Sequence, residues 1–138
     1  MLRLLLIELG IGVPDTQFPV RIGNGVAWAD MRVGCQLFEF DGRLKFRRVD
    51  QGGVATRPVD EILWEERKRE RAVCAEGLGM SRVIWEELFG NQRDRLKKRI
   101  LGEYDVTCAR FGEVLPPHLA ESAARLRAER SARRTRHG

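Results

Sequence analysis

The sequence predicts an α/β domain with a mixed sheet of about four strands that is flanked by helices. Short alternating or β-branched runs follow one another at residues 17–22, 26–33 and 35–40, and a fourth lies at 80–85, after a long helical stretch. The chain has 138 residues, of which 43% are hydrophobic and 33% charged, so it can bury a core of its own. A mostly antiparallel start with one crossover favours helices that cover the sheet.

The first half of the chain contains one short helix and the first three strands. The helix is expected at residues 2–9, because glycines and a proline follow it closely. The run Gly23-Asn24-Gly25 predicts a hairpin turn between the first two strands. Gly34 separates the second strand from the third, which ends before an Asp-Gly pair.

The second half is expected to be mainly helical. Residues 44–58 are polar and contain glycine, which predicts a loop. A long helix then runs to about residue 76, with Asp60 as its N-cap. Residues 102–117 have no clear period and receive no assignment. The remaining helical segments are expected at 86–89, from Asn91 onward after a break at Gly90, and at 119–134.

The three cysteines lie far apart in the sequence. Cys35, Cys74 and Cys108 form no C-x-x-C pair, and the chain has only two histidines, which argues against a disulfide framework and a zinc site. Cys35 and Cys74 are expected to be buried, reduced thiols, so the predicted compartment is the cytoplasm. No apolar run is long enough to span a bilayer, and Glu8 interrupts the apolar start, which we therefore interpret as a helix.

Positive charge is concentrated at the C-terminus. The formal net charge is +5, and residues 119–138 hold six arginines against two acids, a net +4. We expect an α/β domain at residues 1–117 and a basic helix or tail at 118–138. A basic arm suits phosphate backbones, so Arg125, Arg130 and Arg133 are candidate nucleic-acid contacts. A solubilising, frayed helix end explains the composition equally well.

Carboxylates gather at the end of the third predicted strand. Glu39 and Asp41 are two residues apart and so point to the same side of a strand, and Asp30 lies near the end of the preceding strand. Because such carboxylates repel one another, a cation between them is expected, and oxygen ligands favour Mg²⁺ or Mn²⁺. Lys45 follows closely and could orient a metal-bound water. Each residue alone also fits an ordinary turn, strand edge or loop.

Four blocks of sequence between about Leu2 and Leu88 resemble a known superfamily. They are an opening helix and strand (residues 4–10 and 17–20), an acidic block (Ala29-Asp30 and Phe38-Glu39-Phe40-Asp41-Gly42-Arg43-Leu44-Lys45-Phe46), a helix (residues 63–70) and a last strand (residues 79–88). In these blocks the sequence resembles the PD-(D/E)xK nucleases. More narrowly, it is similar to uncharacterised actinobacterial and phage proteins related to very-short-patch-repair endonucleases.

The resemblance implies a restriction-endonuclease-like fold and Mg²⁺- or Mn²⁺-dependent hydrolysis of DNA. It implies that Asp30 and Glu39 ligate the metal, with Asp41 beside them. Asp41 stands where many relatives carry a lysine, and Lys45 would take over that role. Arg43, Lys45 and Arg69 are the expected contacts to DNA around this site.

Two alternatives remain open at the level of sequence. The first is a catalytically weakened module of the same fold that binds nucleic acid or a partner protein. The second is a role in a toxin–antitoxin or phage–host interaction, which rests on family context alone. Relatives often carry an acidic residue earlier in the first helix and an N-terminal DNA-binding domain. Glu8 is the candidate replacement for that acid.

Overall fold

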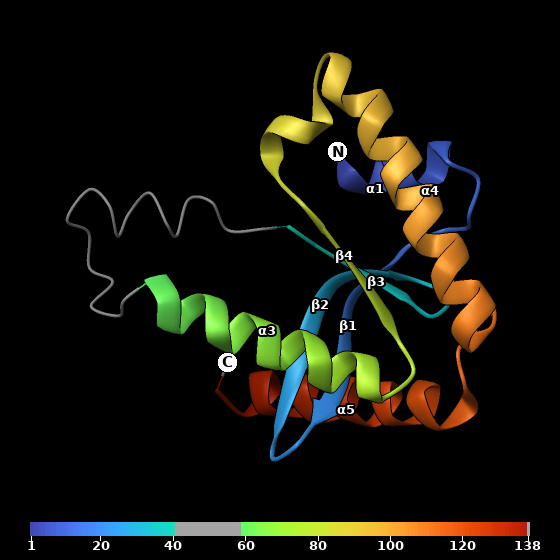
Figure 1. Ribbon diagram of the computed structural model, residues 1–138. Helices are drawn as coiled ribbons and strands as arrows, with labels where there is room; N and C mark the ends of the chain where they lie inside the picture. Colours follow the sequence, from blue (N-terminus) through green and yellow to red (C-terminus); the bar gives the residue numbers. More distant parts are fainter. Residues whose placement is uncertain (41–58, 138) are drawn as a thin grey trace.

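The computed structural model describes residues 1–40 and 59–137 (Figure 1). In chain order the elements are α1 (Leu2–Glu8), β1 (Asp15–Ile22), β2 (Gly25–Val33), β3 (Gln36–Phe40), α3 (Val59–Ala75), β4 (Gly79–Val83), the 3₁₀ helix η1 (Trp85–Leu88), α4 (Asn91–Phe111) and α5 (Pro117–His137). The loop predicted at residues 44–58 lies outside the described residues.

The four strands form one mixed sheet in the order β1-β2-β3-β4. The pairs β1–β2 and β2–β3 are antiparallel, whereas β4 runs parallel to β3. A parallel neighbour requires a crossover, and the chain between β3 and β4 contains α3. The predicted α/β class, with a mixed sheet of four strands flanked by helices, is therefore confirmed.

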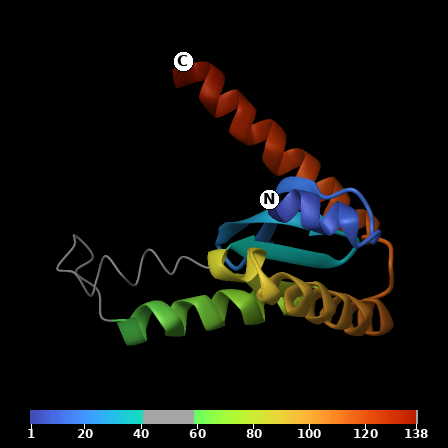
Figure 2. The same cartoon turned by 90° about the horizontal axis from the view of Figure 1, so that it is seen from above.

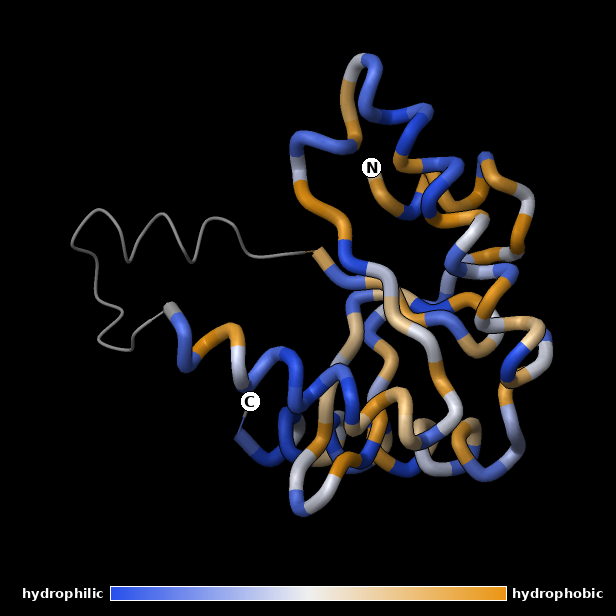
Figure 3. Tube along the Cα trace, viewed as in Figure 1, coloured by the Kyte–Doolittle hydropathy of each residue, from blue (hydrophilic) through white to orange (hydrophobic). Residues whose placement is uncertain are grey.

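Helices cover the sheet on both sides (Figure 1). One core cluster joins α1 and α4 to the sheet and includes Phe38 and Val83. The other joins α3 and α5 to the β1–β2 hairpin and to Leu37. Since Leu37 and Phe38 are neighbours on β3 and belong to different clusters, the middle of the sheet is packed on both faces. Figure 3 shows the hydrophobic stretches gathered in the strands and α1, and a hydrophilic C-terminal helix.

Two glycines hold turns that other residues would strain. Gly23 has a φ of 53° in the two-residue turn between the paired residues Ile22 and Gly25. Gly34 has a φ of 57°, and a Cβ there would lie 2.7 Å from the backbone oxygen of Glu113. The second turn is thus packed against the segment between α4 and α5, and only glycine leaves room for that contact.

Helix boundaries differ from the sequence predictions in two places. α4 continues through residues 102–111, for which no element was assigned. Its buried side of Leu96, Ile100 and Thr107 has helical spacing, but the last of these is polar and obscures the period. Asp60 was predicted as the N-cap of α3, but the helix already includes Val59, so Asp60 lies in the first turn. A carboxylate there is still favoured by the helix dipole.

None of the helices in residues 1–40 and 59–137 combines the length and the apolar character that a membrane crossing requires.

The only tyrosine of the chain, Tyr104, reports on the packing of α4. Burial raises its pKa to about 12, and a hydrogen bond with Cys108 adds to the rise. We expect the tyrosinate absorbance of the native protein to appear with a midpoint near 12, and that of the denatured chain near 10. Because the folded-state pKa is raised, this contribution to stability is complete below pH 10 and is lost as the pH rises towards 12. A native midpoint near 10 would contradict this packing.

Candidate functional site

Asp30 and Glu39 lie together where β2 and β3 meet. The antiparallel register of β2 and β3 ends with Met31 opposite Phe38, and Asp30 and Glu39 are the next residue on each strand. Asp30 Oδ2 accepts a hydrogen bond of 2.9 Å from the backbone N–H of Phe40. The side chain of Asp30 therefore reaches the strand that carries Glu39.

Arg69 from α3 neutralises Glu39. Its Nη1 donates to Glu39 Oε2 at 2.7 Å and its Nη2 lies 2.5 Å from Glu39 Oε1, which is a two-pronged ion pair. The pair is largely shielded from solvent, with side-chain exposures of 30% for Arg69 and 11% for Glu39. Sequence reasoning placed Arg69 near the cleft as a phosphate contact. The structure places it directly on the acidic site.

The positive charge of Arg69 interacts with both Glu39 and Asp30. The hydrogen bond to Glu39 raises the pKa of Arg69, burial opposes this, and the negative charges of Glu39, Asp30 and Glu66 add to the rise. Arg69 Nη2 also donates to the backbone oxygen of Trp28 at 3.3 Å. Asp30, Glu39 and Arg69 thus form one charged cluster, called the acid–arginine cluster below.

The strand that carries Asp30 is irregular at that residue. The β1–β2 ladder pairs residues on both sides of Gln17 and Asp30 but not these two, and Gln17 has a φ of 50°. On a regular strand, residues two apart point to the same side of the sheet. Here, however, Ala29 belongs to the α3–α5 core cluster, whereas Met31 packs against the α1–α4 cluster. Side chains therefore change sides of the sheet at Asp30. Such irregularities occur next to active sites, where they redirect a side chain.

The other predicted members of the site lie outside the described residues. They are Asp41, Arg43 and Lys45, so their distances to the acid–arginine cluster are not part of the structure. Within residues 1–40 and 59–137, no group of three or more Asp, Glu, His or Cys side chains is placed to hold a metal ion. The described portion contributes two carboxylates to the predicted set.

The two carboxylates fit Mg²⁺ or Mn²⁺ by the nature of their donors. Both supply only oxygen, and an ionised carboxylate has about four acceptor positions. Asp30 uses one of them for Phe40, and Glu39 uses both of its oxygens for Arg69. A cation at Glu39 would therefore compete with the guanidinium of Arg69 for the same carboxylate.

Two further acids have structural partners elsewhere. Glu66 of α3 pairs with Arg82 of β4 at 3.1 Å. Glu8, the candidate replacement for an upstream metal-supporting acid, pairs with Arg93 and Lys97, and the hydrogen bonds to these residues lower its pKa. Glu8 therefore fastens α1 to α4, and no contact joins it to Asp30 or Glu39 among the described residues.

The arginines of α5 differ in their surroundings. Arg127 is held by Asp15 at 3.0 Å and by the backbone oxygens of Thr16 and Gln17. Arg130 lies over the ring of Trp28, with its guanidinium carbon 4.2 Å from the ring centre. Arg125 and Arg133, together with the last turns of the helix, are exposed. Figure 2 shows these turns extending away from the sheet.

The three tryptophans differ in their exposure to solvent. Trp64 is 54% exposed and Trp85 is 59% exposed, with Phe89 edge-on against Trp85. Only Trp28 is half-buried, between β2 and α5.

The cysteines are free thiols. Cys35 is buried as predicted and Cys74 is half-buried. Burial raises the pKa of both thiols, which keeps them protonated and unreactive.

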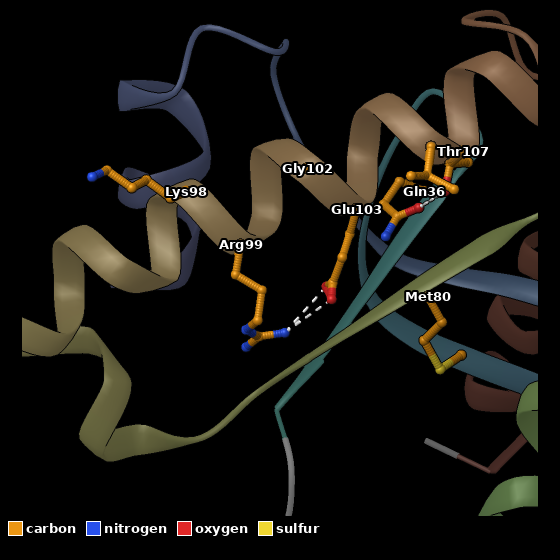
Figure 4. Close-up of a pocket in the computed structure, with 8 residues that line it drawn as sticks. Gln36, Met80, Lys98, Arg99, Gly102, Glu103 and Thr107 are labelled. Atoms are coloured by element: carbon orange, nitrogen blue, oxygen red, sulfur yellow. Dashed lines mark hydrogen bonds and ion pairs between the residues drawn. The ribbon is translucent and has the colours of Figure 1, made fainter.

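Away from the acid–arginine cluster, a hollow of about 570 Å³ lies between β3, β4 and α4 (Figure 4). The buried Gln36 side chain accepts from Thr107 and donates to Ser81 at 2.6 Å, and Ser81 donates to Glu103 at 2.7 Å. Arg99 completes the chain by pairing with Glu103. Because these polar groups form hydrogen bonds and an ion pair with one another, the network joins α4 to the sheet. Its role is therefore structural.

Gly79 is where this network meets β4. A Cβ at Gly79 would collide with the side chains of Thr107 and Gln36. We expect Gly79→Ala to lower the free energy of unfolding by about 1–3 kcal/mol in urea titrations, because the network must move or break. Gly102→Ala is the control: it lies in α4 with nothing within 4 Å, and should stabilise by about 0.5–1 kcal/mol. Equal stability of the Gly79 variant and wild type would contradict the packing.

Comparisons of this chain with protein-family models, with curated proteins and with solved structures find no match.

Proposed function

We propose that this chain is a metal-dependent endonuclease that hydrolyses phosphodiester bonds in DNA. The observation that carries the proposal is that Asp30 and Glu39, on the neighbouring strands β2 and β3, both interact with Arg69, with Glu39 two residues before Asp41 in the sequence. Two carboxylates on neighbouring strands repel one another, and a bound cation would offset the repulsion that Arg69 leaves. The sequence resemblance to PD-(D/E)xK nucleases supports the same reading.

In this proposal Asp30, Glu39 and Asp41 hold Mg²⁺ or Mn²⁺, with Lys45 beside them. The bound cation would polarise the phosphate and activate water. The chain's own part is to hold the carboxylates in place, through the Phe40 N–H on Asp30 and the Arg69 guanidinium on Glu39. Arg69 also sets a positive charge next to the acids, where a phosphate would arrive.

The proposed substrate is DNA, and the proposed contacts to its backbone are Arg43, Lys45, Arg69, Arg125, Arg130 and Arg133. Long-range attraction is supplied by the net charge of +5 and by the arginines of α5. The cytoplasm is the proposed compartment, because all three cysteines are free thiols.

One observation favours a second function, a nuclease-fold module that binds nucleic acid or a partner protein without cutting. Arg69 already occupies both oxygens of Glu39, and so neutralises that carboxylate without a metal. Asp41 in place of the lysine of the resembled family points the same way. A toxin–antitoxin or phage–host role would suit such a module, on family context alone.

Plasmid nicking separates the two functions. Supercoiled plasmid is incubated with the protein in Mg²⁺, in Mn²⁺ or in EDTA, and relaxed and linear products are measured by gel electrophoresis. The endonuclease proposal expects products with either cation and none in EDTA. DNA binding without products in all three conditions would support the second function.

A further inference from the structure

A basic groove runs between the β1–β2 hairpin and α5. It consists of two hollows. One, of about 450 Å³, is lined by Arg21, Asn24, Val26, Trp28, Leu126, Glu129, Arg130 and Arg133. The other, of about 360 Å³, is lined by Thr16, Gln17, Trp28, Arg127, Arg130, Ser131 and Arg134. Trp28 and Arg130 line both hollows, so the two are adjacent, and together they are called the α5 groove below.

The α5 groove is strongly positive. Five arginines line it, and Glu129 is the one acid among its lining residues. Asp15 offsets part of the charge of Arg127. A concave surface with this surplus attracts a chain of phosphates more strongly than a convex helix face would.

The centre of the groove is ordered before any ligand arrives. Arg130 stacks on Trp28, and Arg127 is tied to Asp15 and to two backbone oxygens of β1. Side chains held in this way lose little freedom on binding, which favours affinity. Trp28 also adds a half-buried aromatic ring to both hollows, and a base that stacks there shares the ring with the Arg130 guanidinium.

Trp28 joins the α5 groove to the acid–arginine cluster. Its ring carries Arg130 and its backbone oxygen accepts from Arg69, which in turn holds Glu39.

We propose that the α5 groove binds single-stranded nucleic acid, with the phosphates on the arginines of α5 and β1 and a base at Trp28. The hollows are lined by an aromatic ring together with arginines, a combination that suits an unpaired strand, whereas the bases of a duplex are stacked on one another and do not reach the ring. This inference rests on the nucleic-acid part of the proposed function and is independent of cleavage.

The test is a binding titration in EDTA, which keeps any cleavage out of the measurement. In the variant Trp64→Phe/Trp85→Phe, Trp28 is the only tryptophan left, since the chain has three. We expect its fluorescence to be quenched by single-stranded oligothymidine, and quenched far less by a duplex of equal length. An unchanged Trp28 signal on addition of oligothymidine, or equal quenching by the duplex, would overturn the proposal.

Charge-matched variants locate the binding surface. We expect Arg130→Gln/Arg133→Gln to weaken oligothymidine binding at least about tenfold, and to reduce the slope of log affinity against log salt by about 1.4, since each lost phosphate contact removes about 0.7. The control Arg95→Gln/Lys98→Gln removes two charges from exposed positions of α4 and should change affinity much less. Equal losses in both double variants would overturn the proposal by assigning binding to net charge alone. If plasmid nicking fails while oligothymidine binding persists, the endonuclease proposal is contradicted and the proposal for the α5 groove is not.

Discussion

Replacing Asp30 by Asn is expected to reduce Mg²⁺-dependent plasmid nicking by a factor on the order of 100 or more. The substitution keeps the shape of the side chain, and its amide oxygen can still accept from the Phe40 N–H. It removes one of the two negative charges that the described structure provides for a cation. Glu39→Gln should cause a loss of the same order. Initial rates of plasmid relaxation measure both effects.

The matched control for these variants is Asp105→Asn, an exposed acid on α4. It removes the same charge far from the acid–arginine cluster and should nick at the wild-type rate. Circular dichroism must show that all three variants are folded. An Asp30→Asn protein that is folded and nicks as fast as the Asp105 variant would exclude Asp30 from the site.

Removing Arg69 is expected to have the largest effect on stability. Arg69→Leu leaves the nearly buried carboxylate of Glu39 without its partner, and should lower the free energy of unfolding by about 2–3 kcal/mol. Urea titrations at neutral pH measure it.

Two further variants separate this effect from a general loss of arginine. Arg93→Leu breaks a pair with Glu8, whose side chain is 48% exposed, and should change the free energy of unfolding much less than Arg69→Leu does. The double variant Arg69→Leu/Glu39→Leu removes both charges and should recover part of the stability that Arg69→Leu loses. Additive losses in the double variant would show that the two residues do not form a coupled pair.

The sheet could be predicted from the sequence because its signals are local. The alternating strands and the glycines at 23 and 34 placed β1, β2 and β3 within two residues of their observed ends. The far end of α4 could not be predicted, since Thr107 is polar yet buried. It is buried because Gln36, distant in sequence, offers its amide oxygen. Such a partner becomes visible only once the chain is folded.

The candidate site was likewise only partly predictable from the sequence. Asp30 and Glu39 each stand next to the last paired residue of the β2–β3 ladder, and the strand pattern with its turn at Gly34 could indicate that position from the sequence. The role of Arg69 was not, because its contact to Glu39 joins α3 to β3 across 30 residues. The stacking of Arg130 on Trp28 joins β2 to the last helix and was missed for the same reason. Isolated arginines on an amphipathic helix carry no sign of which one turns inward.

The central claim, that Asp30 and Glu39 hold a divalent cation, is tested most directly by a Mn²⁺ titration followed by electron paramagnetic resonance of the free ion. The wild-type protein is expected to bind Mn²⁺, and Asp30→Asn to bind it at least about tenfold more weakly. Wild-type protein that leaves all Mn²⁺ free, or an Asp30→Asn variant with unchanged affinity, would contradict the claim.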